Sequence, residues 1–295
     1  MGLTEQTRSA IVAAGLSTDV VEAVVDRALS EDLRDGPDIT TVATVRADRL
    51  SRANITPRQA GVLAGGPVAM AVFETVFFDT EFDQLVPDGG DLTPDVPALV
   101  IAGSTAGILT AERTALNLLT HLSGIATATR AWVDAVAGTG ASIRDTRKTL
   151  PGLRALEKYA VRCGGGVNHR MSLGDAALIK DNHVAAAGSV RAAIAAVRVR
   201  DPAIVLEVEV DTLDQLDEAI AAGAELILLD NFSLAGTEEA VRRVRSADRR
   251  VLLEASGGLT LDRAAEVAAT GVDFIAVGAL THSAPALDLG LDLLD

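Results

Sequence analysis

The residues that could carry charge chemistry are concentrated in one window, residues 144–183. All three lysines of the chain lie there, at Lys148, Lys158 and Lys180, whereas every other one of the 26 basic residues is an arginine. A run of three glycines, 164–166, lies in the same window. This concentration indicates either a solvated basic helix face or a site that needs ammonium groups.

Spacing separates these two interpretations. Arg154, Lys158 and Arg162 repeat every four residues, which is the pattern of a charged stripe on one exposed helix face. We therefore interpret these three cations as solvated.

The remaining cations of the window stand at the ends of strand-like runs or beside the glycines. They are Arg147, Lys148, Arg170 and Lys180. Arginine grips carboxylates with a planar fork, and lysine is a compact charge suited to phosphate oxygens. These residue types together predict a ligand that carries both carboxylates and phosphates.

Carboxylates stand in the neighbouring strand-like runs. Glu209 is the penultimate residue of one such run and Asp230 ends the next, and both could bind hydroxyls or a divalent cation such as Mg²⁺. Glu207 lies two residues before Glu209 and faces the same side of its strand. Two acids on one face of an apolar strand need solvent at the sheet edge or an ion pair with an arginine, and both explanations stay open.

Glycine-rich loops follow the last two strand-like runs, at Ser256-Gly257-Gly258 and Gly278-Ala279. Loops in these places of a barrel bind a terminal phosphate through backbone amides. The sequence therefore predicts a phosphate site at these loops.

The histidines and the cysteine predict no metal centre. His121, His183 and His282 lack metal-ligand spacing, and we expect His183, after Asp-Asn, to hold a loop. His169 could hydrogen-bond an anion or transfer a proton. Cys163 is alone, so it cannot form an internal disulfide, and we interpret it as a packed residue before the glycines.

These residues must be positioned by alternating strands and helices. Consecutive βα units imply a parallel sheet, and their number favours a barrel over an open doubly wound sheet. Asp211 and Thr260 are expected helix N-caps, and Gly223 and Gly271 expected helix ends. The expected strands are 141–145, 176–180, 204–210, 225–230, 251–255 and 273–278, and the expected helices 212–222, 234–245 and 261–270.

The first 110 or so residues lack this rhythm and predict a separate α/β module. They contain a helical patch at 18–30 and β-like runs at 60–63 and 98–102. A helix beginning near Thr110 would connect this module to the barrel. We place the N-terminal domain at 1–115 and the barrel domain at 116–280.

The net charge and the hydropathy of the chain argue against several classes of function. The formal net charge of −15 argues against binding to nucleic acid or to an anionic membrane surface. Residues 113–180 nevertheless carry a net charge of +6, which suits a small polyanionic substrate. The N-terminus does not match a signal peptide, and no apolar run reaches the length of a membrane span. We therefore expect a cytoplasmic protein.

A resemblance to a known family emerges from the order of the motifs. The long stretch "DTRKTLPGLRALEKYAVRCGGGVNHRMSLGDAALIKDNH" is similar to the longest motif of the quinolinate phosphoribosyltransferases, which are type II phosphoribosyltransferases also called nicotinate-nucleotide pyrophosphorylases (carboxylating). "EDLRDGPDITT" and "AERTALNLLTHLSGIAT" resemble earlier family motifs, and "LEVEV", "ILLDN", "EASGGL" and "VGALTHS" follow in family order.

The resemblance implies an incomplete β/α barrel with a smaller N-terminal α/β sandwich domain, completed by residues 281–295. It also implies a pentosyltransferase of NAD biosynthesis that joins quinolinate to phosphoribosyl pyrophosphate and releases CO₂. The expected partners are these substrates, Mg²⁺ without an organic cofactor, and a second subunit in a homodimer with shared active sites. The alternatives are a relative that acts on another ring acid such as nicotinate, or a silent nucleotide-binding relative.

The resemblance assigns the site residue by residue. Lys148, Glu209 and Asp230 would be catalytic, and Glu209 and Asp230 would meet Mg²⁺, directly or through the pyrophosphate substrate. The residues implied for quinolinate are Arg113 (reaching into the partner's site), Thr146, Arg147, His169, Arg170 and Lys180. Those implied for phosphoribosyl pyrophosphate are Lys148, Lys180, Glu209, Asp230, Ser256, Gly257, Gly258, Gly278 and Ala279.

Overall fold

The computed structural model describes residues 2–247 and 249–294, which form two compact units. Unit 1 comprises Met1–Arg130, Thr149–Gly165 and Leu280–Asp295, and unit 2 comprises Ala131–Lys148 and Gly166–Ala279. The boundary expected at 115/116 therefore differs from the observed division. Helix α5 (Thr105–Ala135) runs on past residue 115, and in its middle the hydroxyls of Thr127 and Ser123 accept from the backbone N–H groups of Val62 and Ala64 of unit 1.

Unit 2 is built on a six-stranded parallel sheet in the order β6-β11-β10-β9-β8-β7. Each strand from β7 to β10 pairs with its successor, and β6 pairs with β11. Among the described residues β6 and β7 do not pair, so this is an open barrel, as the sequence predicts. The strands are β6 (Ser142–Arg144), β7 (Ala177–Ile179), β8 (Leu206–Val210), β9 (Leu226–Asp230), β10 (Leu252–Ser256) and β11 (Phe274–Ala276).

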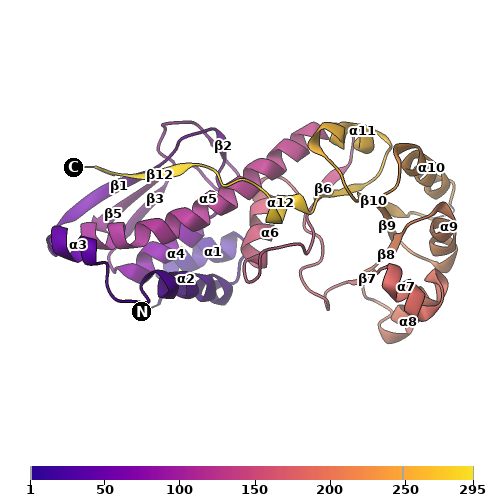
Figure 1. The fold of residues 1–295 in the computed structure, drawn as a ribbon, viewed down its shortest axis with the longest axis horizontal. Coiled ribbons are helices and arrows are strands. Elements are labelled where there is room, and N and C mark those ends of the chain that lie inside the picture. The colour runs from indigo at the N-terminus through magenta and orange to yellow at the C-terminus, as the bar shows by residue number, and fades with distance from the viewer. Residues whose placement is uncertain (1, 248, 295) are drawn as a thin grey trace. The chain divides into compact units, whose positions relative to one another are not determined.

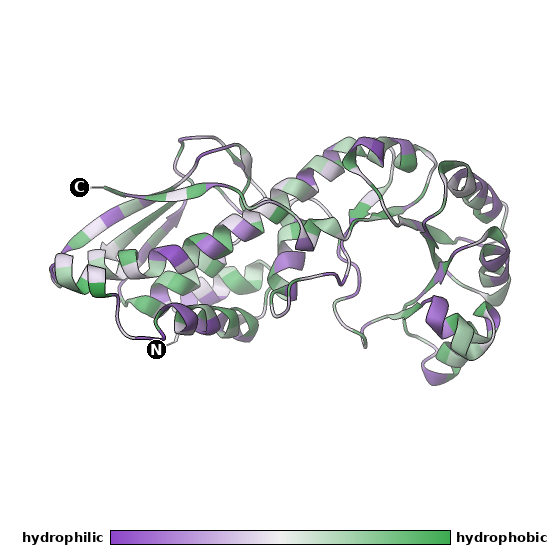
Figure 2. Cartoon of the chain, in the orientation of Figure 1, coloured by the Kyte–Doolittle hydropathy of each residue, from purple (hydrophilic) through white to green (hydrophobic). Residues whose placement is uncertain are grey.

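Helices connect these strands and lie along one side of β7 to β10 (Figure 1). Hydrophilic residues colour much of α9 and α10 (Figure 2), while α9 buries Leu216 and Ala219. The helices 212–222 and 234–245 are confirmed, whereas the segment 261–270 begins with a 3₁₀ turn. The elements are α7 (Asp181–Ala187), α8 (Val190–Arg200), α9 (Leu213–Ala222), α10 (Leu234–Arg245), η1 (Leu261–Arg263) and α11 (Ala264–Ala269).

Capping of α9 corrects one expectation. Thr212, not Asp211, is the N-cap: its hydroxyl accepts from the Gln215 backbone N–H, and the Gln215 side chain accepts from the Asp211 backbone N–H. Asp211 thus lies one residue outside the helix. Gly223 ends α9 with φ 99°, as expected.

The other two expected helix ends lie where the sequence placed them. Thr260 precedes the 3₁₀ turn as its N-cap, although its side chain makes no capping bond. Gly271 follows the end of α11 with φ 94°.

Unit 1 contains a four-stranded antiparallel sheet in the order β12-β1-β5-β3 and a two-stranded sheet, β2-β4. Several helices run along one side of the larger sheet (Figure 1). The helical patch 18–30 and the β-like runs 60–63 and 98–102 are confirmed as α2, β2 and β5. The elements are α1 (Glu5–Ala13), α2 (Thr18–Asp32), α3 (Ile39–Thr44), β1 (Leu50–Pro57), β2 (Gly61–Val62), α4 (Gly66–Val76), β3 (Glu81–Gln84), β4 (Asp91–Leu92), β5 (Leu99–Ser104), α6 (Arg154–Cys163), α12 (Ala279–His282) and β12 (Leu289–Leu294).

Alternation of apolar residues fixes the register of β1 and β5. Ala53 pairs with Ile101 and Ile55 with Leu99, and all four side chains are fully buried. On its other edge, β1 pairs antiparallel with β12 over six residues. The last strand of the chain is therefore part of the sheet of unit 1.

The described residues form no helix that is both long enough and apolar enough to cross a bilayer.

Removing β12 should destabilise unit 1 strongly. A chain ending at Asp288 exposes the edge of β1 and loses the buried Leu289, a side chain worth about 2 kcal/mol by itself. We expect a clearly lower midpoint of thermal unfolding by circular dichroism. The control is Asp292→Ala, which removes only the half-exposed pair with Arg58 and should cost less than about 1 kcal/mol. An unchanged midpoint in the truncated chain would show that β12 is dispensable.

Candidate active site

Two arginines of unit 2 present unpartnered donors. Arg147 follows β6, and Arg170 lies in the segment before β7. The Nε atoms of both are buried and have no hydrogen-bond partner among the described residues, while Arg170 Nη1 donates to the Ala176 carbonyl at 3.2 Å. Burial lowers the pKa of Arg170, and the positive charge of Arg147 lowers it further. Because buried donors are normally bonded, these two guanidinium groups form a candidate site for an anion.

The segment that carries Arg170 is anchored from below by a buried carboxylate. Asp145 Oδ1 accepts from the His169 backbone N–H at 2.7 Å, and Oδ2 accepts from Asn168 Nδ2 at 2.6 Å. Val167 forms a parallel bridge with Arg144, so the segment extends along the outer edge of β6. Asp145 and this bridge together fix the backbone from which Arg170 projects.

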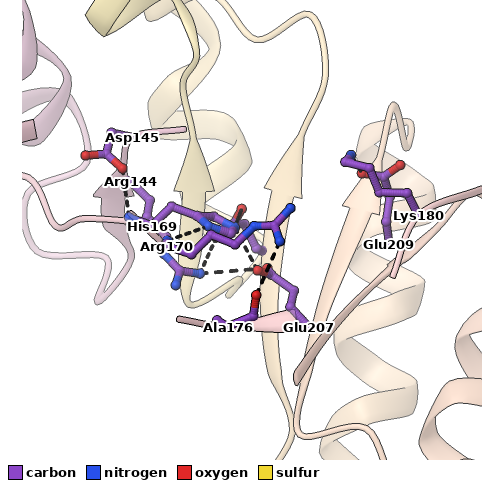
Figure 3. Close-up of polar contacts among 9 residues, drawn as sticks. Arg144, Asp145, His169, Arg170, Ala176, Lys180, Glu207 and Glu209 are labelled. Carbon is purple, nitrogen blue, oxygen red and sulfur yellow. Dashed lines mark hydrogen bonds and ion pairs between the residues drawn. The ribbon is translucent and has the colours of Figure 1, made fainter. Parts of the chain in front are cut away.

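Next to this segment lies a charged layer, which we define as Arg144, His169, Glu207 and Glu254; the last three are buried and Arg144 is partly buried. Figure 3 shows Arg144, His169 and Glu207 of this layer. His169 Nε2 lies 2.7 Å from Glu207 Oε2, and Arg144 Nη1 lies 2.6 Å from Glu254 Oε2 and 3.7 Å from Glu207 Oε1. Of the two explanations for Glu207, the ion pair with an arginine is the one observed. Sequence reasoning did not assign Arg144 or Glu254 to this layer, although each is a charged residue in a short apolar strand.

Burial raises the pKa of Glu254 to about 8, and the negative charge of Glu207 adds to this effect, whereas Arg144 opposes it. His169, Glu207 and Glu254 also offer three ligand atoms within 4.8 Å of one another. Arg144 already supplies a positive charge at both carboxylates, so we do not assign a metal to this cluster.

A second group of charges lies at the carboxyl ends of β7 to β10. Lys180 follows β7, and its ammonium group forms an ion pair with Glu209 near the end of β8; Figure 3 shows the two side by side. Asp230, the last residue of β9, pairs in register with Ser256, the last residue of β10. Lys180 therefore contacts Glu209, and Asp230 lies beside Ser256 at the ends of two paired strands.

Glu209 and Asp230 have donor atoms that fit a hard divalent cation. One oxygen of Glu209 is bonded to Lys180, and one oxygen of Asp230 accepts from Asn231 Nδ2 at 2.8 Å. The second oxygen of each has no hydrogen bond within the described residues. Carboxylate oxygens of this kind suit Mg²⁺ held together with a phosphorylated substrate.

The glycine loop after β10 interlocks with the loop after β9. Asn231 donates its backbone N–H to the Ser256 carbonyl at 2.9 Å. Gly257 has φ 97°, and a Cβ there would lie 2.2 Å from Asn231 Oδ1 and 2.9 Å from Asn231 N. Gly258 has φ 57° but faces open space. Gly278 and Ala279 follow β11, the neighbouring strand.

Thr146 and Lys148, two further expected site residues, flank Arg147 in the chain. Lys148 is exposed, and its backbone N–H donates to Thr146 Oγ1 at 3.0 Å. Arg113 is exposed on α5 in unit 1. Its reach into a partner's site stays a prediction.

The interpretation of the Arg154, Lys158 and Arg162 stripe as solvated is wrong for Lys158. These residues lie on α6 in unit 1, where Lys158 is fully buried, Arg154 is half-buried and only Arg162 is exposed. Four-residue spacing identifies one helix face but does not say what covers it. The lysine window is therefore divided between the two units.

The remaining singled-out residues have local roles. His183 Nδ1 accepts from the Lys180 backbone N–H at 2.9 Å, so it holds the start of α7, as expected of a loop histidine. His121 contacts the buried Glu157 at 2.9 Å. Burial raises the pKa of Cys163 to about 11, which fits a packed thiol.

Replacing Gly257 and Gly258 by alanine, one at a time, should distinguish the cost of a left-handed backbone from the cost of a steric clash. Gly258→Ala forces a left-handed alanine into open space and should lower the free energy of unfolding by about 1 kcal/mol. Gly257→Ala carries the same strain and also collides with Asn231, so we expect a loss of at least about 2 kcal/mol. Urea unfolding measures both. Equal losses would contradict the interlocking of the two loops.

Glu254→Gln should flatten the pH dependence of stability. In the folded protein Glu254 keeps its proton up to about pH 8, whereas the unfolded chain releases it near 4.5. Folding therefore binds a proton in this window, and the wild-type free energy of unfolding falls as pH rises from 4.5 to 8, by about 1 kcal/mol per pH unit. Glutamine lacks this proton, so its stability relative to wild type should rise with pH in urea titrations. Parallel wild-type and variant curves would contradict a raised pKa.

Comparisons with known proteins agree with this geometry. The family model described as the C-terminal domain of quinolinate phosphoribosyl transferase matches residues 125–292, and the N-terminal domain model matches residues 38–123. A nicotinate-nucleotide pyrophosphorylase [carboxylating] of Mycobacterium leprae is 58% identical over 93% of this chain and 98% of its own length.

Two further relatives extend the likeness. A probable nicotinate-nucleotide pyrophosphorylase [carboxylating] of Synechocystis is 40% identical over 93% of each chain. The solved structure of the nicotinate-nucleotide pyrophosphorylase from Francisella tularensis superposes with a TM-score of 0.88 at 38% identity, covering 95% of this chain and 98% of that one. The chain therefore belongs to the quinolinate phosphoribosyl transferase family.

Proposed function

We propose that this protein transfers the phosphoribosyl group of phosphoribosyl pyrophosphate to quinolinate and releases pyrophosphate and CO₂, which yields nicotinate mononucleotide for NAD biosynthesis. The observation that carries the proposal is the pair Arg147 and Arg170, whose buried Nε–H groups lack partners. The names of the relatives support the same reaction.

The paired arginines suit a dicarboxylate. Each carboxylate of quinolinate can accept two parallel hydrogen bonds from a guanidinium fork, and nicotinate would leave one fork unpartnered in a buried place. Thr146 and Lys180 would add a hydroxyl and an ammonium group, and Arg113 of a partner subunit would complete the site in a homodimer.

The second substrate would lie across the strand ends. Lys148 and Lys180 would neutralise the pyrophosphate, Glu209 and Asp230 would bind the ribose hydroxyls, and the loops at 256–258 and 278–279 would bind the 5′-phosphate through backbone amides. Mg²⁺ bound with this substrate at Glu209 and Asp230 would neutralise charge on the leaving pyrophosphate. Lys180 must exchange its ion pair with Glu209 for the substrate.

Charge development explains how these residues accelerate the reaction. The pyridine nitrogen attacks the anomeric carbon while the bond to pyrophosphate breaks, so the sugar becomes cationic and the leaving group gains charge. Carboxylates near the ribose and lysines near the pyrophosphate stabilise both changes. After N-ribosylation the ring nitrogen is cationic, and the bond from C2 to its carboxylate breaks to release CO₂. The electron pair stays on C2, where the adjacent N⁺ stabilises it, and a proton from water then binds C2.

Two assays on the purified protein test the reaction. Coupled detection of pyrophosphate, with phosphoribosyl pyrophosphate and Mg²⁺, should give turnover with quinolinate and at least about 100-fold less with nicotinate. Trapped CO₂ should equal pyrophosphate in amount. Preference for nicotinate, or pyrophosphate without CO₂, would reject quinolinate as the substrate.

Lys148→Ala should abolish turnover with little effect on folding. The side chain is exposed, so stability should change by less than about 0.5 kcal/mol, whereas loss of a cation at the leaving group should lower kcat by about 100-fold or more. Arg200→Ala, which removes an exposed cation at the end of α8, is the matched control and should keep wild-type kinetics. Wild-type steady-state kinetics in Lys148→Ala would refute its assignment.

A further inference from the structure

The imidazole of His169 is held at both ring nitrogens. Nδ1 accepts from the Arg170 backbone N–H at 2.7 Å, and Nε2 lies 2.7 Å from Glu207 Oε2. Because Nδ1 acts as an acceptor, the ring proton belongs on Nε2 and is donated to Glu207. Within this geometry the ring links Glu207 to the backbone of Arg170.

Glu207 is itself fixed. It lies within β8 with strands β7 and β9 on either side, and only 3% of it is exposed. Arg144 approaches its other oxygen at 3.7 Å and is bound in turn to Glu254 at 2.6 Å. A rigid acceptor on a central strand can therefore set the orientation of the imidazole.

The position of the Arg170 guanidinium depends more on the orientation of the His169 ring than on the hydrogen bonds of its own side chain. Within the described part of the chain its guanidinium has one hydrogen bond, from Nη1 to the Ala176 carbonyl, and its buried Nε has none. The backbone on the N-terminal side of Arg170 is set by the His169 ring through the Arg170 N–H. A rotated imidazole would release this N–H and displace the guanidinium from Arg147.

We propose that Glu207 is a positioning residue for dicarboxylate recognition: by accepting from His169 Nε2 it fixes the imidazole that orients Arg170 toward the acid substrate. This inference rests on the proposed function for the identity of the acid. Glu207 touches no substrate in this arrangement and acts through His169.

Steady-state kinetics of two substitutions test the role. Glu207→Leu removes the acceptor and should raise the KM for quinolinate about tenfold, with the KM for phosphoribosyl pyrophosphate within about twofold of wild type. Glu207→Gln keeps an acceptor oxygen and should restore the quinolinate KM to within about threefold. Glu239→Leu, which removes a carboxylate paired with Arg242 and Arg243 on α10, is the control and should leave both values unchanged. Equal changes in both KM values, or none in either, would overturn the proposal.

Nitrogen-15 spectra of the ring nitrogens give a readout on the wild-type protein that does not depend on turnover. The chain has four histidines, so His169 can be assigned by comparison with His169→Gln. We expect the wild-type ring as the neutral Nε2–H tautomer, with a proton protected from exchange. A proton on Nδ1 would overturn the proposal even if quinolinate is the substrate. An Nε2–H ring in an enzyme that prefers another acid would support the positioning role and reject only the substrate.

Discussion

The constraint on which unit 2 depends is the burial of His169, Glu207 and Glu254 inside an open sheet, beside the partly buried Arg144. Charges removed from water are tolerated only when each is paired or neutralised, and removal of one partner leaves the others uncompensated. Arg144 contacts both Glu207 and Glu254, and burial favours the protonated form of Glu254. The layer therefore approaches neutrality, and it provides fixed acceptors where an apolar core would provide none.

Membership of this layer distinguishes carboxylates with a structural role from carboxylates that a ligand can reach. Glu207 and Glu209 share one face of β8, yet Glu207 is committed to His169 and Arg144, whereas Glu209 meets a lysine that is partly exposed. Two residues along a strand thus mark the change from interior to strand end. Arg144 offsets the negative charge beneath Arg147 and Arg170, and the buried Nε atoms of these two arginines have no hydrogen-bond partner among the described residues.

The sequence predicted the elements of this arrangement better than their contacts. Alternating strands and helices identify the βα units, and residues at strand ends such as Glu209 and Asp230 can be located from strand boundaries alone. Lys158 shows the limit, because its spacing indicates a helix face and only tertiary packing decides that the face is buried. The partnership of Arg144 with Glu254 was equally inaccessible, since it joins the first strand of the sheet to the fifth along the chain. Contacts of that separation depend on the closure of the sheet, which periodicity does not encode.

The gap in the barrel explains where the anion site forms. A closed barrel would pair β6 with β7, but in the described residues these strands do not pair, and the segment that includes Val167 bridges to β6 instead. An unpaired strand edge must be covered, and an irregular segment does so while leaving its side chains free of sheet alternation. Arg147 leaves one side of this gap and Arg170 belongs to the segment that covers it. The backbone N–H groups of this segment are not used in a regular β-ladder, so Asp145 and His169 can accept hydrogen bonds from them. These bonds hold the positive charges of Arg147 and Arg170 close together, and a bound anion would neutralise them.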